Sequence, residues 1–257
     1  MTIIQSIILG IVEGVTEFLP ISSTGHMILA SKLMGIANSD FTKSFEIIIQ
    51  LGSILAVVVL YWHRIWHGGK ELWKKVAVAF LPTAVIGFLL YKVLKTYLLS
   101  NAIIVVWALA LGGLALIAFE WWYAHAAARR APKEITYKKS FTIGVAQALA
   151  IIPGVSRSGA TIVAGMAMGI TREAIVEFSF LLAIPTMAAA TGYDFLKSSH
   201  SFNNSQLGIL FIGFVVAFIS AMLSVKWLVG FIKSHTFTAF GIYRIVVALF
   251  FFIFVIK

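Results

Sequence analysis

Long apolar stretches recur along this chain and set the strongest limit on its fold. Six of them approach the roughly 20 residues that an α-helix needs to cross the hydrocarbon core of a bilayer. They are Phe45–Trp62, Val76–Leu94, Ala102–Tyr123, Phe178–Phe195, Leu207–Val229 and Phe237–Ile256. Only 12% of the residues are charged, about half of what is usual for a soluble domain. The sequence therefore predicts an all-α polytopic membrane protein.

Two further apolar segments, Ile3–Met34 and Phe141–Ile170, are too broken to be simple spans. The interruptions are Pro20 with the run Ser22–His26, and Pro153–Gly154 with the run Ser156–Gly159. We interpret each segment as a re-entrant hairpin of two short helices joined by a polar turn. Backbone that leaves a helix at membrane depth is tolerated only where protein buries it or a wet cavity solvates it. The two turns are therefore expected to meet inside the protein, near the midplane.

The two halves of the chain resemble each other weakly at an offset of 134 residues, with one hairpin and three spans in each. The matched pairs are Gly10 with Gly144, Glu13 with Gln147, Ser22 with Ser156 and Gly25 with Gly159. An odd number of spans inverts the second copy, and paired broken segments in such repeats point to a binding site. We predict one integral-membrane domain over 1–257 with six transmembrane helices and two re-entrant hairpins. Repeat one covers 1–123, a cytoplasmic loop 124–140 and the inverted repeat two 141–257.

Lys and Arg residues lie unevenly on the two predicted sides. With the N-terminus outside, twelve of the twenty fall in inside segments and six outside, while Arg157 and Arg244 lie in the apolar zone. Positive charge favours the cytoplasmic side, so we predict a multi-pass protein of the bacterial inner membrane with both termini outside. The charges cluster between apolar spans, which argues against a nucleic-acid partner for the net charge of +10. We expect no signal peptide, because no basic leader precedes the first apolar run.

Glu13 and Glu17 are four residues apart in the first hairpin, so they share one face of a helix. Two carboxylates at membrane depth are costly unless they meet a cation, a proton or water. They are either a protonated pair that forms hydrogen bonds within the bundle, or a divalent-metal or acid/base site. Cysteine is absent, which excludes thiolate ligands and disulfides.

The turn that follows contains three hydroxyls, a glycine and an imidazole, from Ser22 to His26. Ser23 and His26 are three residues apart, near enough for the imidazole to activate the hydroxyl. If Gly25 permits the bend, backbone N–H groups of the turn could also face an anion. Such a turn alone would often be a helix cap, but the neighbouring carboxylates favour a catalytic role.

The second hairpin carries the positive charge that an anionic substrate requires. Arg157 lies among Ser156, Ser158 and Thr161 at an expected helix start. Its planar fork of donors suits phosphate oxygens. An ion pair with Glu13 or Glu17 is the alternative, and the two roles are compatible in an empty site. Elsewhere, Glu46, Gln50 and Glu177 flank spans and could either line the cavity or form structural hydrogen bonds. Asp194 and Arg244 could pair between helices.

Four segments resemble the undecaprenyl-diphosphate phosphatase family that is linked to bacitracin resistance, and the similarity extends over essentially the whole chain. They are EGVTEFLPISSTGH (13–26), FEIIIQLGSILAVV (45–58), PGVSRSGAT (153–161) and EFSFLLAIP (177–185). The resemblance implies that Glu13 and Glu17 form the acidic motif and that Ser23 and His26 lie in the catalytic turn. It also implies that Ser156, Arg157 and Thr161 form the phosphate-binding motif. The substrate, a C55 isoprenoid diphosphate recycled during peptidoglycan synthesis, comes from the resemblance alone.

The resemblance thus implies hydrolysis of undecaprenyl diphosphate to undecaprenyl phosphate and inorganic phosphate. Ser23 is the expected nucleophile and His26 its base, with Glu17 orienting His26 or binding metal and Arg157 stabilising the transition state. Attack by His26 or by metal-bound water stays open. One arginine cannot balance a diphosphate, so we expect a divalent cation, Mg²⁺ or Ca²⁺, on Glu13 and Glu17. Substrate binding is expected from Ser22, Thr24, Gly25, Ser156, Ser158 and Thr161.

Two rival functions are compatible with parts of this pattern. A polyprenyl-phosphate flippase or transporter shares the architecture of inverted repeats around broken helices, and fold alone cannot separate it from an enzyme. A phosphatidic-acid-type phosphatase would need a second histidine soon after Arg157, but the next one is His200. The sequence also leaves open whether the protein is a homo-oligomer.

Overall fold

In the computed structural model, residues 1–37, 39–93, 97–98, 101–127, 133–198 and 203–254 are described, and none of them lies in a β-strand. The α-helices of the first half are α1 (Ile3–Thr16), α2 (Ser23–Leu33), α3 (Asp40–Ile48), α4 (Gln50–Leu60), α5 (Trp62–His67), α6 (Gly69–Val93) and α7 (Ala102–Trp122). Those of the second half are α8 (Tyr137–Ala148), α9 (Arg157–Ala167), α10 (Arg172–Ser198), α11 (Asn204–Phe231) and α12 (Thr238–Phe254). A π-helix, η2 (Tyr123–Ala127), follows α7, and a 3-10 turn, η3 (Leu149–Ile151), follows α8.

Five stretches are long and apolar enough to cross a membrane. They are Asp40–Leu60, Gly69–Leu90, Ala102–His125, Arg172–Tyr193 and Asn204–Phe231. The sixth predicted span, Phe237–Ile256, corresponds to α12, which is apolar but shorter. The predicted span ends Leu94 and Ile256 lie outside the described residues. The prediction of an all-α, multi-pass membrane protein is confirmed at this level, whereas the count of six spans stays a prediction.

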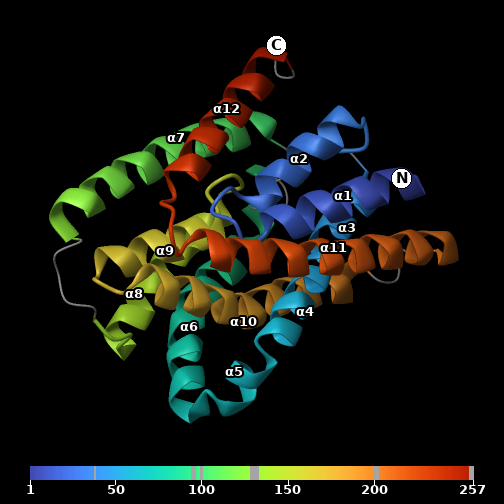
Figure 1. Cartoon of the computed structure of the whole chain (residues 1–257). Helices are drawn as coiled ribbons and strands as arrows, with labels where there is room; N and C mark the ends of the chain where they lie inside the picture. The colour runs from blue at the N-terminus through green and yellow to red at the C-terminus, as the bar shows by residue number, and fades with distance from the viewer. Residues whose placement is uncertain (38, 94–96, 99–100, 128–132, 199–202, 255–257) are drawn as a thin grey trace.

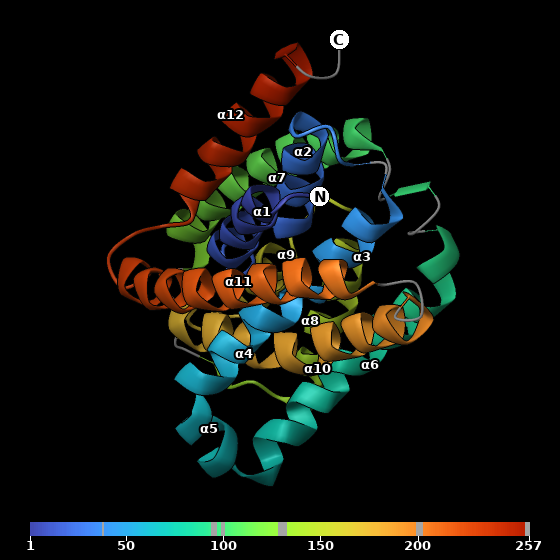
Figure 2. The ribbon, with the colours of Figure 1, turned by 90° about the vertical axis from the view of Figure 1, so that its right-hand side faces the viewer.

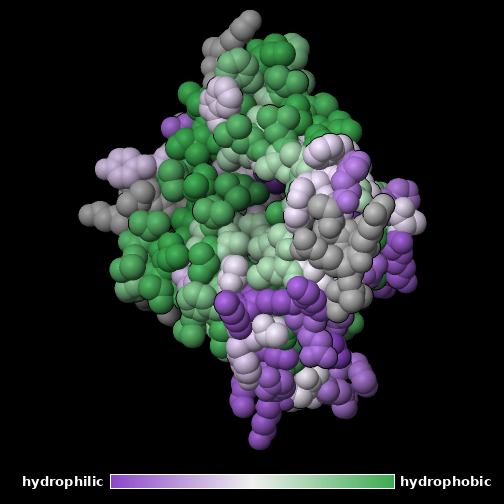
Figure 3. Space-filling view, turned by 90° about the vertical axis from the view of Figure 1, so that its left-hand side faces the viewer, coloured by the Kyte–Doolittle hydropathy of each residue, from purple (hydrophilic) through white to green (hydrophobic). Residues whose placement is uncertain are grey.

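The surface has a hydrophobic zone and a hydrophilic zone, as expected of a membrane protein. Figure 3 shows a broad hydrophobic face with hydrophilic side chains gathered at one end of the molecule, where Figure 1 places α5 and the start of α6. Large apolar side chains such as Phe88 and Phe211 are exposed on the long helices, where lipid would cover them. The exposed basic residues Arg64, Lys70 and Lys74 lie on α5 and at the start of α6.

Two helical hairpins occupy the middle of the molecule. The first hairpin consists of α1 and α2, and the second of α8, η3 and α9. They lie between the α7/α12 pair and the group of α4, α10 and α11 (Figure 2). This central position encloses both interrupted segments in protein.

Glycines let the hairpins approach their neighbours closely. α1 packs along α11, and α8 packs along α6. A Cβ atom on Gly10 would lie 2.8 Å from the carbonyl oxygen of Gly213, and one on Gly144 would clash with that of Ala79. Small residues at a crossing allow two membrane helices to pack backbone against backbone. Gly10 and Gly144, matched in the internal alignment, thus occupy equivalent crossings.

Candidate active site

The turns of both hairpins end in a serine with a left-handed backbone conformation. Ser22 has φ 71° and Ser156 has φ 80°, and no other described residue except glycine has a positive φ. Each is the N-cap of the helix that follows: Ser22 Oγ accepts from the Gly25 N–H at 3.4 Å, and Ser156 Oγ from the Gly159 N–H at 3.1 Å. Strained residues of this kind persist where the surrounding structure enforces them, and they cluster at functional sites.

Arg244 on α12 holds both turns in place. Only 2% of this residue is exposed, and its guanidinium donates to five backbone carbonyls. These belong to Pro20 (3.1 Å), Gly154 (2.8 Å) and Val155 (3.0 Å) in the two turns, and to Ala108 (3.0 Å) and Leu109 (3.3 Å) in α7. The side chain of Asp194 lies outside the described residues, so the expected pairing of Arg244 with Asp194 stays a prediction. Arg244 therefore satisfies three turn carbonyls that lie outside the helices at membrane depth and ties them to α7.

Glu17 joins the two hairpins. Its Oε2 accepts a short hydrogen bond from Ser23 Oγ in the first hairpin. Its Oε1 accepts from Arg157 Nη2 of the second hairpin at 3.1 Å. Arg157 Nη1 also donates to the carbonyl oxygen of Ser179 at 3.3 Å. Three predicted catalytic residues, Glu17, Ser23 and Arg157, thus converge on one point.

His26 lies apart from this cluster. Its Nδ1 lies 2.8 Å from the Ser22 carbonyl oxygen and its Nε2 lies 3.0 Å from the Tyr243 hydroxyl. The two rings stack with centroids 5.5 Å apart and an interplanar angle of 6°. Because a carbonyl oxygen only accepts, Nδ1 carries the hydrogen and Nε2 accepts from Tyr243.

The expected hydrogen bonds from His26 to Ser23 and Glu17 are absent, and all three side chains are described. The left-handed conformation of Ser22 turns Ser23 back toward Glu17. The carboxylate, rather than the imidazole, therefore accepts the serine hydrogen in this structure. Sequence reasoning also missed Tyr243, which is 217 residues from His26.

Glu13 is fully buried one helical turn before Glu17. Ser53 and Glu17 lie close enough to interact with it. Neither of its carboxylate oxygens has a hydrogen-bond partner of good geometry among the described residues. No cluster of three potential metal ligands of the His, Cys, Asp or Glu types occurs in the described part of the chain. Orphaned carboxylate oxygens nevertheless suit a hard cation that a substrate phosphate helps to coordinate.

The predicted substrate-binding hydroxyls of the second hairpin are engaged with each other, with the first hairpin and with α10. Ser158 Oγ donates to the Leu19 carbonyl at 2.8 Å and lies 3.1 Å from Ser156 Oγ. Thr161 Oγ1 lies 2.7 Å from Ser179 Oγ. Gly25 lies against the second turn, where an added Cβ would be 3.3 Å from Gly154 Cα.

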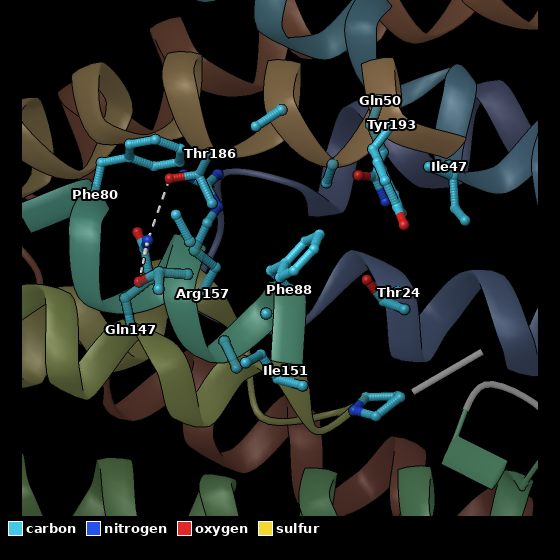
Figure 4. A pocket seen from close by; sticks show the side chains of 17 residues that line it. Thr24, Ile47, Gln50, Phe80, Phe88, Gln147, Ile151, Arg157, Thr186 and Tyr193 are labelled. Atoms are coloured by element: carbon cyan, nitrogen blue, oxygen red, sulfur yellow. Dashed lines mark hydrogen bonds between the residues drawn. The ribbon is translucent and has the colours of Figure 1, made fainter. Parts of the chain in front are cut away.

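A cavity of about 520 Å³ opens beside this cluster. Figure 4 shows Thr24, Gln50, Gln147 and Arg157 among the side chains that line it. The lining also includes these apolar or aromatic residues: Ile47, Phe80, Phe88, Ile151 and Tyr193. An apolar pocket with a few convergent polar groups is the usual form of a ligand site. Of the predicted site residues, Thr24 and Arg157 reach this cavity.

The comparison with known proteins bears directly on this site. Residues 6–250 match the model of the family described as bacitracin resistance protein BacA. The chain belongs to the BacA family. It is 54% identical over 249 residues to a protein of Aquifex aeolicus named undecaprenyl-diphosphatase, covering 97% of both chains. A protein of the same name from Sulfurihydrogenibium sp. is 50% identical over 254 residues, covering 98% of this chain and 99% of its own. Another, from Wolinella succinogenes, is 52% identical over 252 residues, covering 98% of this chain and 97% of its own.

Two cavity residues of this BacA-family chain were not among the predicted site residues. Gln147 donates through Nε2 to Thr83 Oγ1 at 2.9 Å and to Thr186 Oγ1 at 3.2 Å. Gln50 also lines the cavity. The internal alignment of Gln147 with Glu13 could have signalled the first, whereas Gln50 belongs to the segment 45–58 that resembles the family and was expected as a possible cavity residue.

Proposed function

We propose that this BacA-family chain hydrolyses undecaprenyl diphosphate to undecaprenyl phosphate and inorganic phosphate. It thereby recycles the lipid carrier of peptidoglycan synthesis and contributes to bacitracin resistance. The observation that carries the proposal is the contact of Ser23, from one hairpin, and Arg157, from the other, with Glu17. A nucleophile, a proton acceptor and a phosphate-binding guanidinium are thus in one place.

In the proposed reaction, Ser23 Oγ attacks the terminal phosphorus while its proton passes to Glu17. The bond from that phosphorus to the bridging oxygen breaks, and the electron pair leaves with undecaprenyl phosphate. Glu17 passes the proton from Ser23 to the departing undecaprenyl phosphate. Water then attacks the phosphoserine and gives one proton to Glu17, which transfers it to Ser23 Oγ as the bond from phosphorus to Oγ breaks and inorganic phosphate departs. Arg157 turns its donor fork from Glu17 to the phosphate oxygens, where charge increases in the transition state.

A divalent cation, Mg²⁺ or Ca²⁺, belongs to this proposal. Glu13 and Glu17 would hold it, and the unpartnered oxygens of Glu13 support that assignment. When bound, the cation supplies positive charge that offsets the charge of the diphosphate. Glu13 would then keep its side chain ionised without a protein cation of its own.

Phosphate release by the purified protein in detergent tests the function. We expect undecaprenyl phosphate and inorganic phosphate to form in equal amounts. A flippase, which the names of the relatives do not favour, would release neither product in detergent, where there is no second compartment. A pure preparation that binds the lipid and releases no phosphate would therefore overturn the proposal.

We also propose that six transmembrane helices and two re-entrant hairpins form two inverted repeats within one integral-membrane domain. The packing supports this, because exchanging α1 with α8, α4 with α10 and α6 with α11 preserves the main contacts. α1 packs on α11 as α8 packs on α6, and α4 packs on α11 as α10 packs on α6. The matched left-handed serines, Ser22 and Ser156, follow the same exchange.

Both termini are proposed to lie outside. The wild type has no cysteine, so Lys32→Cys and Lys133→Cys each give one labelling site, both at exposed side chains. An impermeant maleimide should label the Lys32 variant in intact cells and the Lys133 variant only after lysis. The reverse pattern would invert the orientation.

A further inference from the structure

Gln50 is the first residue of α4, directly after the break that separates α3 from α4 at Ile49. Its side chain lines the cavity together with Thr24 and Arg157. Neither amide atom of Gln50 has a hydrogen-bond partner among the described residues, whereas the amide nitrogen of Gln147 is engaged with two threonines. Gln50 thus presents free donors to the cavity.

The face of α4 that carries Gln50 is turned toward the catalytic cluster. Ser53 is one helical turn further along α4 and lies beside Glu13. In Figure 4, Gln50 and Thr24 lie on the far side of Phe88 from Arg157 and Gln147. The cavity is therefore polar on two sides, with Arg157 on one and Gln50 and Thr24 on the other.

Gln50 is half-buried, and a substrate that fills the cavity would remove its amide from water. A buried donor left without a partner costs roughly 1–3 kcal/mol, and an isoprenoid chain has no acceptor to offer. The diphosphate has two phosphates, of which the terminal one is assigned to Ser23 and Arg157. The phosphate that bears the isoprenyl chain is left for the opposite side of the cavity.

We propose that Gln50 donates its amide hydrogens to the phosphate that bears the isoprenyl chain, and so makes the site specific for a diphosphate. This inference rests on the proposed phosphatase function and adds a specificity residue to it. Gln50 binds the part of the substrate that becomes isoprenyl monophosphate. It does not contact the terminal phosphate that is released.

Product inhibition separates this role from a structural one. Gln50→Met keeps the length of the side chain and removes both donors. With the purified full-length protein in detergent, a short-chain isoprenyl diphosphate serves as substrate and the matching isoprenyl monophosphate and inorganic phosphate serve as inhibitors. The inhibition constant of the monophosphate should rise roughly 10- to 100-fold, as expected for the loss of a hydrogen bond to a charged group. The inhibition constant of inorganic phosphate should change by less than about 2-fold, since Arg157 and not Gln50 binds the terminal phosphate.

Gln147→Met is the matched control, because it removes a second cavity amide whose donors are already engaged. It should leave the ratio of the two inhibition constants unchanged. Gln50→Glu, which keeps the shape and replaces the donors by acceptors, should reproduce the selective loss and serves if the methionine variant does not fold. The inference is overturned if both constants change together or if neither changes in an active Gln50 variant. Absence of phosphate release by the wild type would instead refute the proposed function itself.

Discussion

At the scale of residues, Glu17 is the point where the two halves of the chain meet chemically. It lies within the first hairpin, accepts a hydrogen bond from Ser23 six residues later, and pairs with Arg157, which is 140 residues away. The Ser23 contact is buried and the Arg157 contact is partly buried, and ionic hydrogen bonds are stronger in such surroundings than in water. The carboxylate is therefore the proton acceptor nearest to the proposed nucleophile.

Substitution of Glu17 should therefore lower kcat more than substitution of His26. Glu17→Gln removes the acceptor for the Ser23 proton, and we expect a loss of about 10²–10⁴-fold in kcat, the usual range for a general base. His26→Ala should cost less than about 10-fold, because the imidazole contacts none of the three clustered residues. The measurement is steady-state phosphate release, with Tyr243→Phe as the control for the His26 environment. A loss in His26→Ala equal to that in Glu17→Gln would restore the imidazole as the base.

Glu13 should govern the requirement for metal. Glu13→Gln should raise the Mg²⁺ concentration for half-maximal activity by about 10-fold or more, since it removes an anionic ligand. The control is Glu177→Gln, which breaks a distant ion pair between Glu177 Oε1 and Arg64 Nε, 2.8 Å apart. It should leave the Mg²⁺ concentration for half-maximal activity unchanged. Equal midpoints in wild type and Glu13→Gln would show that Glu13 does not bind the cation.

Some of the residues of the site could be predicted from the sequence and others could not. Glu13, Glu17 and Arg157 stood out because charges at membrane depth require partners. Arg244 stood out as a charge in the apolar zone, but its backbone carbonyl partners could not be predicted because they have no sequence signature. Tyr243 was outside the predicted site because its position depends on how distant helices pack. Gln50 was expected as a possible cavity residue, and it does line the cavity.

At the scale of elements, the polar turns and the glycine crossings fix the hairpins. The apolar pattern located both hairpins and five of the spans with small shifts at their ends. It did not predict the break at Ile49 within the span Phe45–Trp62, because hydropathy is insensitive to a local change in helical hydrogen bonding. Gln50, the residue after the break, lines the cavity.

The crossing of α8 and α6 offers a test of the packing. Gly144→Ala adds a methyl group that would clash with the Ala79 carbonyl, and we expect a destabilisation of about 1–3 kcal/mol from overpacking. Gly230→Ala in α11 meets no atom within 4 Å and should stabilise the helix by up to about 1 kcal/mol. In detergent, the thermal unfolding temperature should be highest for Gly230→Ala, intermediate for the wild type and lowest for Gly144→Ala. A Gly144→Ala protein as stable as the wild type would contradict the close crossing.

At the scale of the whole molecule, the proposed catalytic centre needs both halves of the chain, so neither half should hydrolyse the substrate alone. The internal offset of 134 residues indicated two related halves, and the limit on exposed backbone in a membrane placed both turns inside protein. How the halves dock could not be predicted, because it depends on side-chain packing between α1 and α11 and between α6 and α8. In the structure this docking brings Ser23 and Arg157 to the same carboxylate.

Phosphate release from undecaprenyl diphosphate by wild type, Ser23→Ala and Arg157→Lys, purified in the same detergent, tests this central claim most directly. Each variant alters one hairpin. Ser23→Ala removes the nucleophile, and Arg157→Lys keeps the charge but loses the two-pronged geometry. Both should lose at least about 10²-fold in kcat/KM while they unfold at the temperature of the wild type. Near-normal turnover in either folded variant would contradict a catalytic centre shared by the two hairpins.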